Sequence, residues 1–117
     1  MNAEPVIDAI TFTELKTTVG ADFIGELIDA YLDETPTLIN ELVEALAQQD
    51  VTKFSRSAHS IKSSSAALGA LLFSAQAKEL EMIGKQGSLA GVQPKVEQLK
   101  MNYVQVQQKL RELKDES

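Results

Sequence analysis

The stretch that decides the fold runs from Val51 to Ala70 and reads VTKFSRSAHSIKSSSAALGA. The positions expected to face a core recur at intervals of three and four residues, the spacing of one face of an α-helix. These positions are Val51, Phe54, Ala58, Ile61, Ser65 and Leu68. Asp50 precedes them as a helix N-cap and Gly69 follows them as a helix end, so the stretch predicts one amphipathic helix.

The first half of the chain carries the same helical period, and no run of residues alternates in the period of a β-strand. Thr11 to Glu14 reads as a capping box with Thr11 as N-cap, and it predicts a short helix that ends at Gly20. A helix over 22–34 then meets Pro36. Thr35 is expected to cap a renewed helix there, or the two pieces form one long helix kinked near Pro36.

The second half predicts two more helices. One runs from Leu71 to Lys85 and stops at Gln86-Gly87, and the last begins at Ser88 or in the Pro94 region. The apolar residues that share one face of 22–34 are Phe23, Leu27, Ile28, Tyr31 and Leu32. Those expected to be buried in 71–85 are Leu72, Phe73, Ala77, Leu80 and Ile83. The last helix has a heptad-like seam formed by Val92, Val96, Leu99, Tyr103, Val106, Leu110 and Leu113.

Four substantial helices joined by short turns predict an all-α fold, an antiparallel up-down-up-down four-helix bundle with a short extra N-terminal helix. A chain of 117 residues is expected to form a single domain, 1–117, with its core in about 10–114. A dimeric coiled coil and a helical array remain alternatives, although the sequence has no internal repeat to favour the array.

Composition excludes several classes of function. A net charge of −6 disfavours a nucleic-acid binder. The absence of cysteine excludes disulfides and thiolate metal sites and fits a reducing compartment. The N-terminal residues lack a basic residue, and the apolar run from Ala66 to Phe73 is too short to span a bilayer. We therefore expect a cytoplasmic protein that does not bind membranes.

Charge is distributed unevenly along the chain. Residues 1–50 hold eleven acidic residues and one base, whereas residues 51–78 hold four bases and no acid. These bases are Lys53, Arg56, Lys62 and Lys78. A local positive field favours an approaching phosphoryl group or an acidic partner surface, with chance clustering as the alternative.

His59 is the single histidine of the chain. Its row on the predicted helix contains Ser55, Lys62 and Ala66, with Ser63 beside it, so small residues leave space for another protein to reach the ring. Two interpretations are open: a half-buried core histidine, or a solvent-facing nucleophile. A lone imidazole lacks the partner ligands of a metal site, and a regular bundle does not supply the strained turn and oxyanion hole of a serine hydrolase.

A neutral imidazole can itself accept a phosphoryl group, and Lys62 could stabilise the transferred oxygens. Antiparallel packing about Gly69-Ala70 brings a residue near Glu81 level with His59. Glu81, or Gln76 nearer the turn, could then accept a hydrogen bond from one ring nitrogen and leave the other free to attack. The alternative for Glu81 is a solvated surface charge.

The stretch Ala58 to Ala70, AHSIKSSSAALGA, resembles the signature of histidine-containing phosphotransfer (HPt) domains, roughly A-H-x-L-K-G-S-[SA]-x-x-[LI]-G-A. Leu80-Glu81, Gly87 and the run from Phe23 to Leu46 extend the resemblance to about residues 10–114. The resemblance implies a four-helix bundle whose histidine accepts a phosphoryl group from one receiver-domain aspartate and passes it to another.

In that family pattern His59 matches the phosphoacceptor and Lys62 the lysine near the phosphate. Ser63 stands where glycine is usual, at the point of closest approach by the receiver. The resemblance further implies a phosphorelay intermediate that is not an autonomous enzyme and has no ATP-binding kinase core. It implies no cofactor on this chain, because Mg²⁺ is supplied by the receiver.

The expected partners are receiver domains of response regulators or of hybrid sensor kinases, bound by a monomer. Two rival hypotheses remain. One is a helical interaction module that is never phosphorylated, and the other is a coiled-coil oligomerisation domain built on the seam from Val92 to Leu113.

Overall fold

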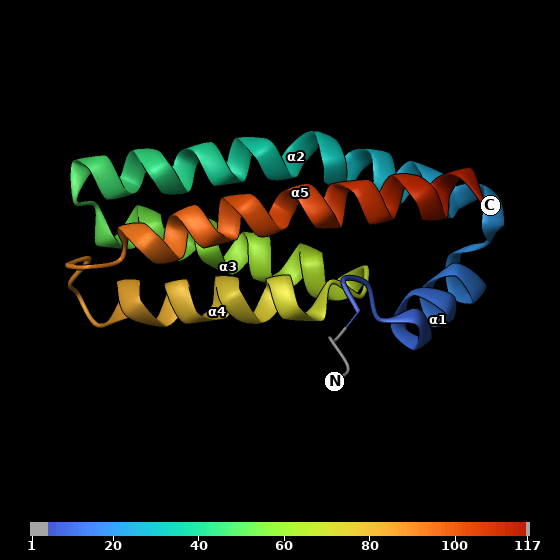
Figure 1. Cartoon of the computed structure of the whole chain (residues 1–117), viewed down its shortest axis with the longest axis horizontal. Coiled ribbons are helices and arrows are strands. Elements are labelled where there is room, and N and C mark those ends of the chain that lie inside the picture. The colour runs from blue at the N-terminus through green and yellow to red at the C-terminus, as the bar shows by residue number, and fades with distance from the viewer. Residues whose placement is uncertain (1–4, 117) are drawn as a thin grey trace.

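The helical period of the sequence is realised as five α-helices in a computed structural model, which describes residues 5–116 (Figure 1). They are α1 (Ala9–Val19), α2 (Ala21–Gln48), α3 (Val51–Ala67), α4 (Leu71–Lys85) and α5 (Gln93–Asp115). Helices α2 to α5 run alternately up and down, and α1 lies across one end of the bundle (Figure 1). The predicted four-helix bundle with a short N-terminal helix is confirmed. No helix among the described residues is long and apolar enough to cross a membrane.

The core is formed by one apolar stripe from each long helix. On α3 the predicted stripe is confirmed, with Phe54, Ala58 and Ile61 fully buried. On α5 the predicted seam is also buried, and Leu113 packs against its edge. Burial of these stripes against one another is the main favourable contribution to folding of a bundle of this size.

Helix α2 continues through Pro36, which agrees with the predicted alternative of one long helix and not with a renewed helix that begins at Thr35. Thr35 is therefore not an N-cap; it faces the core with 1% of its surface exposed. Pro36 lies on the exposed side of the helix, where water can satisfy the carbonyl that loses its hydrogen-bond donor. A proline at such a position interrupts one hydrogen bond without ending the helix.

Two predicted core residues are on the surface. Phe23 is 47% exposed and Leu72 is 44% exposed. The buried stripe of α2 begins one residue later, at Ile24, and continues through Ile28 and Tyr31. The next residue in each case, Ile24 or Phe73, is buried. Successive residues are about 100° apart around a helix, so a prediction that is one residue out places a surface side chain in the core.

The N-cap of α1 is Asp8, and not Thr11 as the capping-box pattern predicted. The Asp8 carboxylate accepts hydrogen bonds from the Thr11 backbone N–H at 2.9 Å and from the Thr11 hydroxyl at 2.7 Å. Asp8 is a good N-cap in its own right, and Thr11 occupies the third position of the helix instead.

Two glycines allow the close packing of α3 and α4. A Cβ atom at Gly84 on α4 would lie 3.1 Å from Cβ of Ser55 and 3.2 Å from the Phe54 ring. At the turn between the helices, Gly69 has a φ of +91°, and its carbonyl accepts a hydrogen bond from the Asp8 N–H at 2.8 Å. The hairpin that carries His59 is therefore tight along its length and is tied to the N-terminal segment.

We expect Gly69→Ala to destabilise the protein more than Gly87→Ala. Both glycines have positive φ, which costs a residue with a side chain about 1–2 kcal/mol. At Gly69 the new Cβ would also lie 3.0 Å from the Asp8 carbonyl oxygen, whereas nothing lies within 4 Å at Gly87. Urea unfolding of the two variants measures the difference, and equal losses would contradict the proposed contact with Asp8.

Candidate functional site

The site lies where α3 and α4 pack against each other. The turn at Gly69-Ala70 folds α4 back along α3, and Glu81 is level with His59, as the hairpin geometry predicts. The distance from His59 Nδ1 to Glu81 Oε2 is 2.8 Å. Residues 22 positions apart in the chain therefore form one hydrogen-bonded pair.

The two side chains differ sharply in exposure. The His59 side chain is 57% exposed, so it is not a core histidine, whereas the Glu81 side chain is 5% exposed. A carboxylate can only accept hydrogen bonds, so the Nδ1 of His59 carries the hydrogen. In the neutral ring Nε2 then keeps its lone pair, and the ring presents a nucleophilic nitrogen that Glu81 does not occupy.

Two lysines complete the cluster around the Glu81 carboxylate. Lys62 Nζ lies 2.8 Å from Oε1, and Lys85 Nζ lies 3.1 Å from Oε2. Lys62 was predicted as a phosphate ligand and is found paired with Glu81. Sequence reasoning missed Lys85, although its position four residues after Glu81 on one helix is a signal for an ion pair.

The cations hold Glu81 in its charged form. Its pKa falls from the usual 4.5 to about 2, chiefly because Lys62 donates a hydrogen bond to the carboxylate. Burial opposes this shift, and the hydrogen bonds from Lys85 and His59 add to it. A buried carboxylate stays ionised here because each of its oxygens receives charged or polar hydrogens.

The small residues of the His59 row have different surroundings. Ser63 is exposed and Ala66 is half-buried, so neither blocks access to the ring. Ser55 lies at the contact with Gly84, and its hydroxyl donates a hydrogen bond of 3.4 Å to the Glu81 carbonyl oxygen. Ser55 therefore supports the packing beneath the site and does not form part of its open surface.

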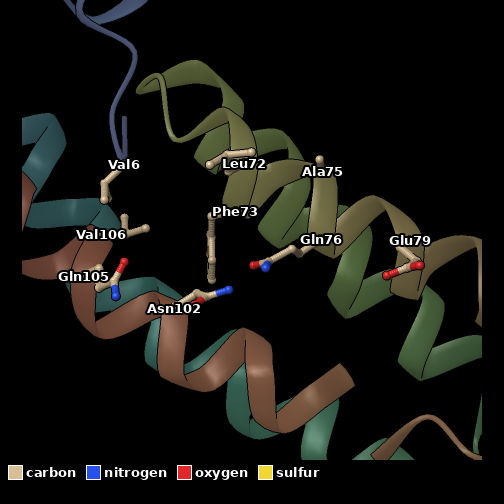
Figure 2. Close-up of a pocket in the computed structure, with 9 residues that line it drawn as sticks. All are labelled: Val6, Leu72, Phe73, Ala75, Gln76, Glu79, Asn102, Gln105 and Val106. Atoms are coloured by element: carbon tan, nitrogen blue, oxygen red, sulfur yellow. The ribbon is translucent and has the colours of Figure 1, made fainter. Parts of the chain in front are cut away.

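The structure does not bring Gln76 to His59. Gln76 lies five positions before Glu81, an offset of about 140° around the helix, so the two side chains leave α4 in different directions. Figure 2 shows the Gln76 amide pointing towards Asn102 of α5. There it lines a cavity of about 480 Å³ between α4 and α5, and its carbonyl oxygen is buried without a hydrogen-bond partner.

The arrangement is suited to accepting a phosphoryl group. It combines an exposed imidazole, a buried carboxylate that fixes the ring, and two ammonium groups near the same point. Within residues 5–116 no group of three or more histidine, cysteine, aspartate or glutamate side chains could hold a metal ion.

Glu81 should make stability depend on pH. Because its pKa is about 2 when folded against 4.5 ordinarily, its contribution is present in full above about pH 5 and is lost as the pH falls towards 2. We expect the unfolding free energy of wild type relative to Glu81→Gln to decrease between neutral pH and about pH 3. Denaturant unfolding at both values measures it, with Glu79→Gln, an exposed carboxylate on α4, as the control. A difference that does not change with pH would contradict the pKa.

Two comparisons with known proteins, one of sequence and one of structure, both identify histidine phosphotransfer proteins. The family model described as "Hpt domain" matches residues 26–115. The crystal structure of histidine-containing phosphotransfer protein B (HptB) from Pseudomonas aeruginosa PAO1 superimposes with a TM-score of 0.91 at 23% sequence identity. That match covers 98% of this chain and 99% of the other, so the two share one fold. A search of curated proteins found no match.

The family match spans most of the chain and includes both helices of the His59 hairpin. Hpt domains interact with receiver domains in phosphorelays and act in phosphotransfer, not as kinases. The chain therefore belongs to the Hpt domain family, the histidine phosphotransfer domains of phosphorelay signal transduction.

Proposed function

We propose that His59 is the residue that carries the phosphoryl group, relaying it between receiver-domain aspartates. The observation that supports this most directly is the exposed ring whose Nδ1 is held at 2.8 Å by the buried Glu81. That contact orients the imidazole and leaves Nε2 as the attacking atom. Phosphoryl transfer requires mainly positioning and charge neutralisation, so a site of this simplicity is sufficient when the partner supplies the donor.

The transfer step balances without a separate acid or base. The Nε2 lone pair attacks the phosphorus of an aspartyl phosphate, the N–P bond forms, and the P–O bond to the aspartate breaks. The aspartate leaves as a carboxylate, while Nδ1 keeps its hydrogen and the ring gains positive charge. Glu81 lies beside that charge and stabilises it.

Lys62 is proposed to stabilise the phosphoryl oxygens during transfer. Its side chain is 28% exposed and belongs to the same helix as His59, one turn away. The Lys62 ammonium can therefore turn from Glu81 towards a phosphoryl group on Nε2. Lys85 remains on Glu81 in that arrangement and keeps its carboxylate paired.

The proposed partners are receiver domains of response regulators or of hybrid sensor kinases, meeting the protein as a monomer in the cytoplasm. The surface beside the ring includes the small residues Ser63, which is exposed, and Ala66, which is half-buried. The acid-free region 51–78 suits a receiver because its phosphorylated pocket is acidic. The chain itself would need no cofactor, and the receiver would supply Mg²⁺.

A helical interaction module that is never phosphorylated is the second candidate. It has the same bundle and the same exposed surface, and it differs only in the chemistry of His59. The buried carboxylate on Nδ1 favours the relay, because a module that only docks has no need to orient an imidazole.

His59→Gln should abolish labelling by a phosphorylated receiver domain. Wild type is expected to gain an acid-labile, alkali-stable label when it is incubated with labelled receivers, because phosphohistidine has that stability profile. Gel autoradiography after acid and alkali treatment measures this. A label that persists in His59→Gln, or a wild type that no receiver of the source organism labels, would contradict the proposal.

Lys62→Ala should slow phosphoryl transfer on the order of tenfold while leaving the fold intact, since one charge-assisted hydrogen bond is lost. Lys53→Ala is the matched control, because Lys53 is on the same helix and pairs with Glu44 away from the site. Stopped labelling reactions give the rates and far-ultraviolet circular dichroism gives the helicity. Equal rates for the two variants, or loss of helicity in Lys62→Ala alone, would show that Lys62 has been given the wrong role.

A further inference from the structure

We propose that the cavity between α4 and α5 binds a small, neutral amide that carries an apolar ring. The cavity has a volume of about 480 Å³, which is within the range of small-molecule sites in proteins. It lies on the side of α4 that faces α5, whereas Glu81 reaches His59 from the side that packs on α3. The inference is therefore independent of phosphoryl transfer at His59.

Apolar side chains form the inner wall of the cavity. Phe73 of α4 and Val106 of α5 line it, and each is only 2% exposed. Figure 2 shows the Phe73 ring projecting from α4 towards α5, and Val6, from the segment before α1, near one end of the space. Leu72 also lines the cavity and is 44% exposed, so this part of the wall is open to solvent. An apolar ring that enters against Phe73 would leave water, which is favourable.

Two side-chain amides supply the polar part of the lining. The carbonyl oxygen of Gln76 is buried and has no hydrogen-bond partner among the described residues. Asn102 accepts a hydrogen bond of 3.1 Å from Gln98 through its own carbonyl oxygen, which orients the Asn102 amide. Figure 2 shows the Asn102 nitrogen pointing towards Gln76. The cavity thus presents one acceptor from α4 and one donor group from α5.

An amide group on a ligand would match this pair of side chains. Its N–H would donate to the Gln76 carbonyl oxygen, and its own carbonyl would accept from the Asn102 nitrogen. A buried acceptor without a donor costs free energy, so the ligand N–H would supply an interaction that the folded chain does not make for itself. The polar groups therefore select for a ligand that has a donor and an acceptor side by side.

The charges at the cavity select for a neutral ligand. Among the described residues that line it, Glu79 is the only charged one. Its exposed carboxylate pairs with Lys95 of α5 at 3.2 Å, so the ion pair joins the two helices. A carboxylate or phosphate on the ligand would lose water without gaining a cation from the lining, which is unfavourable. An uncharged amide does not meet this cost.

The test uses benzamide, a small compound that combines an apolar ring with an amide. It is titrated into the ¹⁵N-labelled full chain, and ¹H–¹⁵N correlation spectra follow the side-chain amide signals of Gln76 and Asn102. We expect both signals to shift together and to saturate, with a dissociation constant on the order of 1 mM for a ligand of this size. Unmoved Gln76 and Asn102 signals, or shifts that centre on the exposed Met101, would overturn the proposal.

Two matched compounds test the chemistry of the ligand. Acetophenone keeps the ring and the carbonyl but has a methyl group in place of the amide nitrogen. It should bind roughly fivefold more weakly than benzamide, because the hydrogen bond to Gln76 is lost. Benzoate is anionic and should give no saturable shift. Equal affinities for benzamide and acetophenone would show that the Gln76 carbonyl does not recognise the ligand.

Variants of the chain test the assigned residues. Gln76→Met keeps the length of the side chain and removes its amide, so it should weaken benzamide binding roughly fivefold and abolish the preference over acetophenone. Asn102→Leu should weaken both compounds, because both carry the carbonyl, and it serves as a second variant if Gln76→Met does not fold. Gln108→Leu changes an exposed glutamine of α5 outside the lining and should leave the affinity unchanged.

The outcomes are separate from those of the proposed function, because no phosphoryl donor is present in these measurements. Unchanged benzamide affinity in a folded Gln76→Met or Asn102→Leu variant would overturn the ligand site and leave the relay function standing. Failure of every receiver domain to label His59 would overturn the relay function and leave the ligand site standing.

Discussion

The close packing of α3 against α4 is the constraint on which the site depends. Gly84 on one helix leaves room for Ser55 and Phe54 on the other, and Gly69 allows the turn between them. At this separation a side chain on α4 can reach across to the solvent edge of α3. The meeting of Glu81 with His59 is therefore a consequence of backbone packing and not of the two residues alone.

The same packing explains why the site contains so much charge. Once Glu81 is buried between the helices, its carboxylate requires partners, because an unpaired buried charge is costly. Lys62 and Lys85 supply them from two helices, and His59 supplies a third hydrogen bond. A buried anion thus holds together the exposed His59 imidazole and two ammonium groups, which links the packing of the hairpin to the proposed chemistry.

Much of the fold could be predicted from the sequence, and the failures have local causes. The bounds of α4 and the seam of α5 were predicted well because strong periodicity and turn residues mark them. The sequence left open whether Pro36 separates two helices or lies within one, because the effect of a proline depends on whether it faces solvent. Asp8 and Thr11 are both residue types that can cap the first helix. The folded segment shows that Asp8 is the N-cap, because its carboxylate accepts hydrogen bonds from the backbone N–H and the hydroxyl of Thr11.

For the site, the sequence by itself predicted that Lys62 lies one turn from His59 on the same helix and that a residue near Glu81 lies level with the ring, because helical spacing and one hairpin turn are local properties. Only the tertiary structure decided that Glu81 is buried, that Lys85 forms an ion pair with it, and that Gln76 points into the cavity between α4 and α5. These facts depend on the rotation of α4 about its own axis. That angle is set by packing against α3 and α5 together, which no stretch of sequence specifies alone.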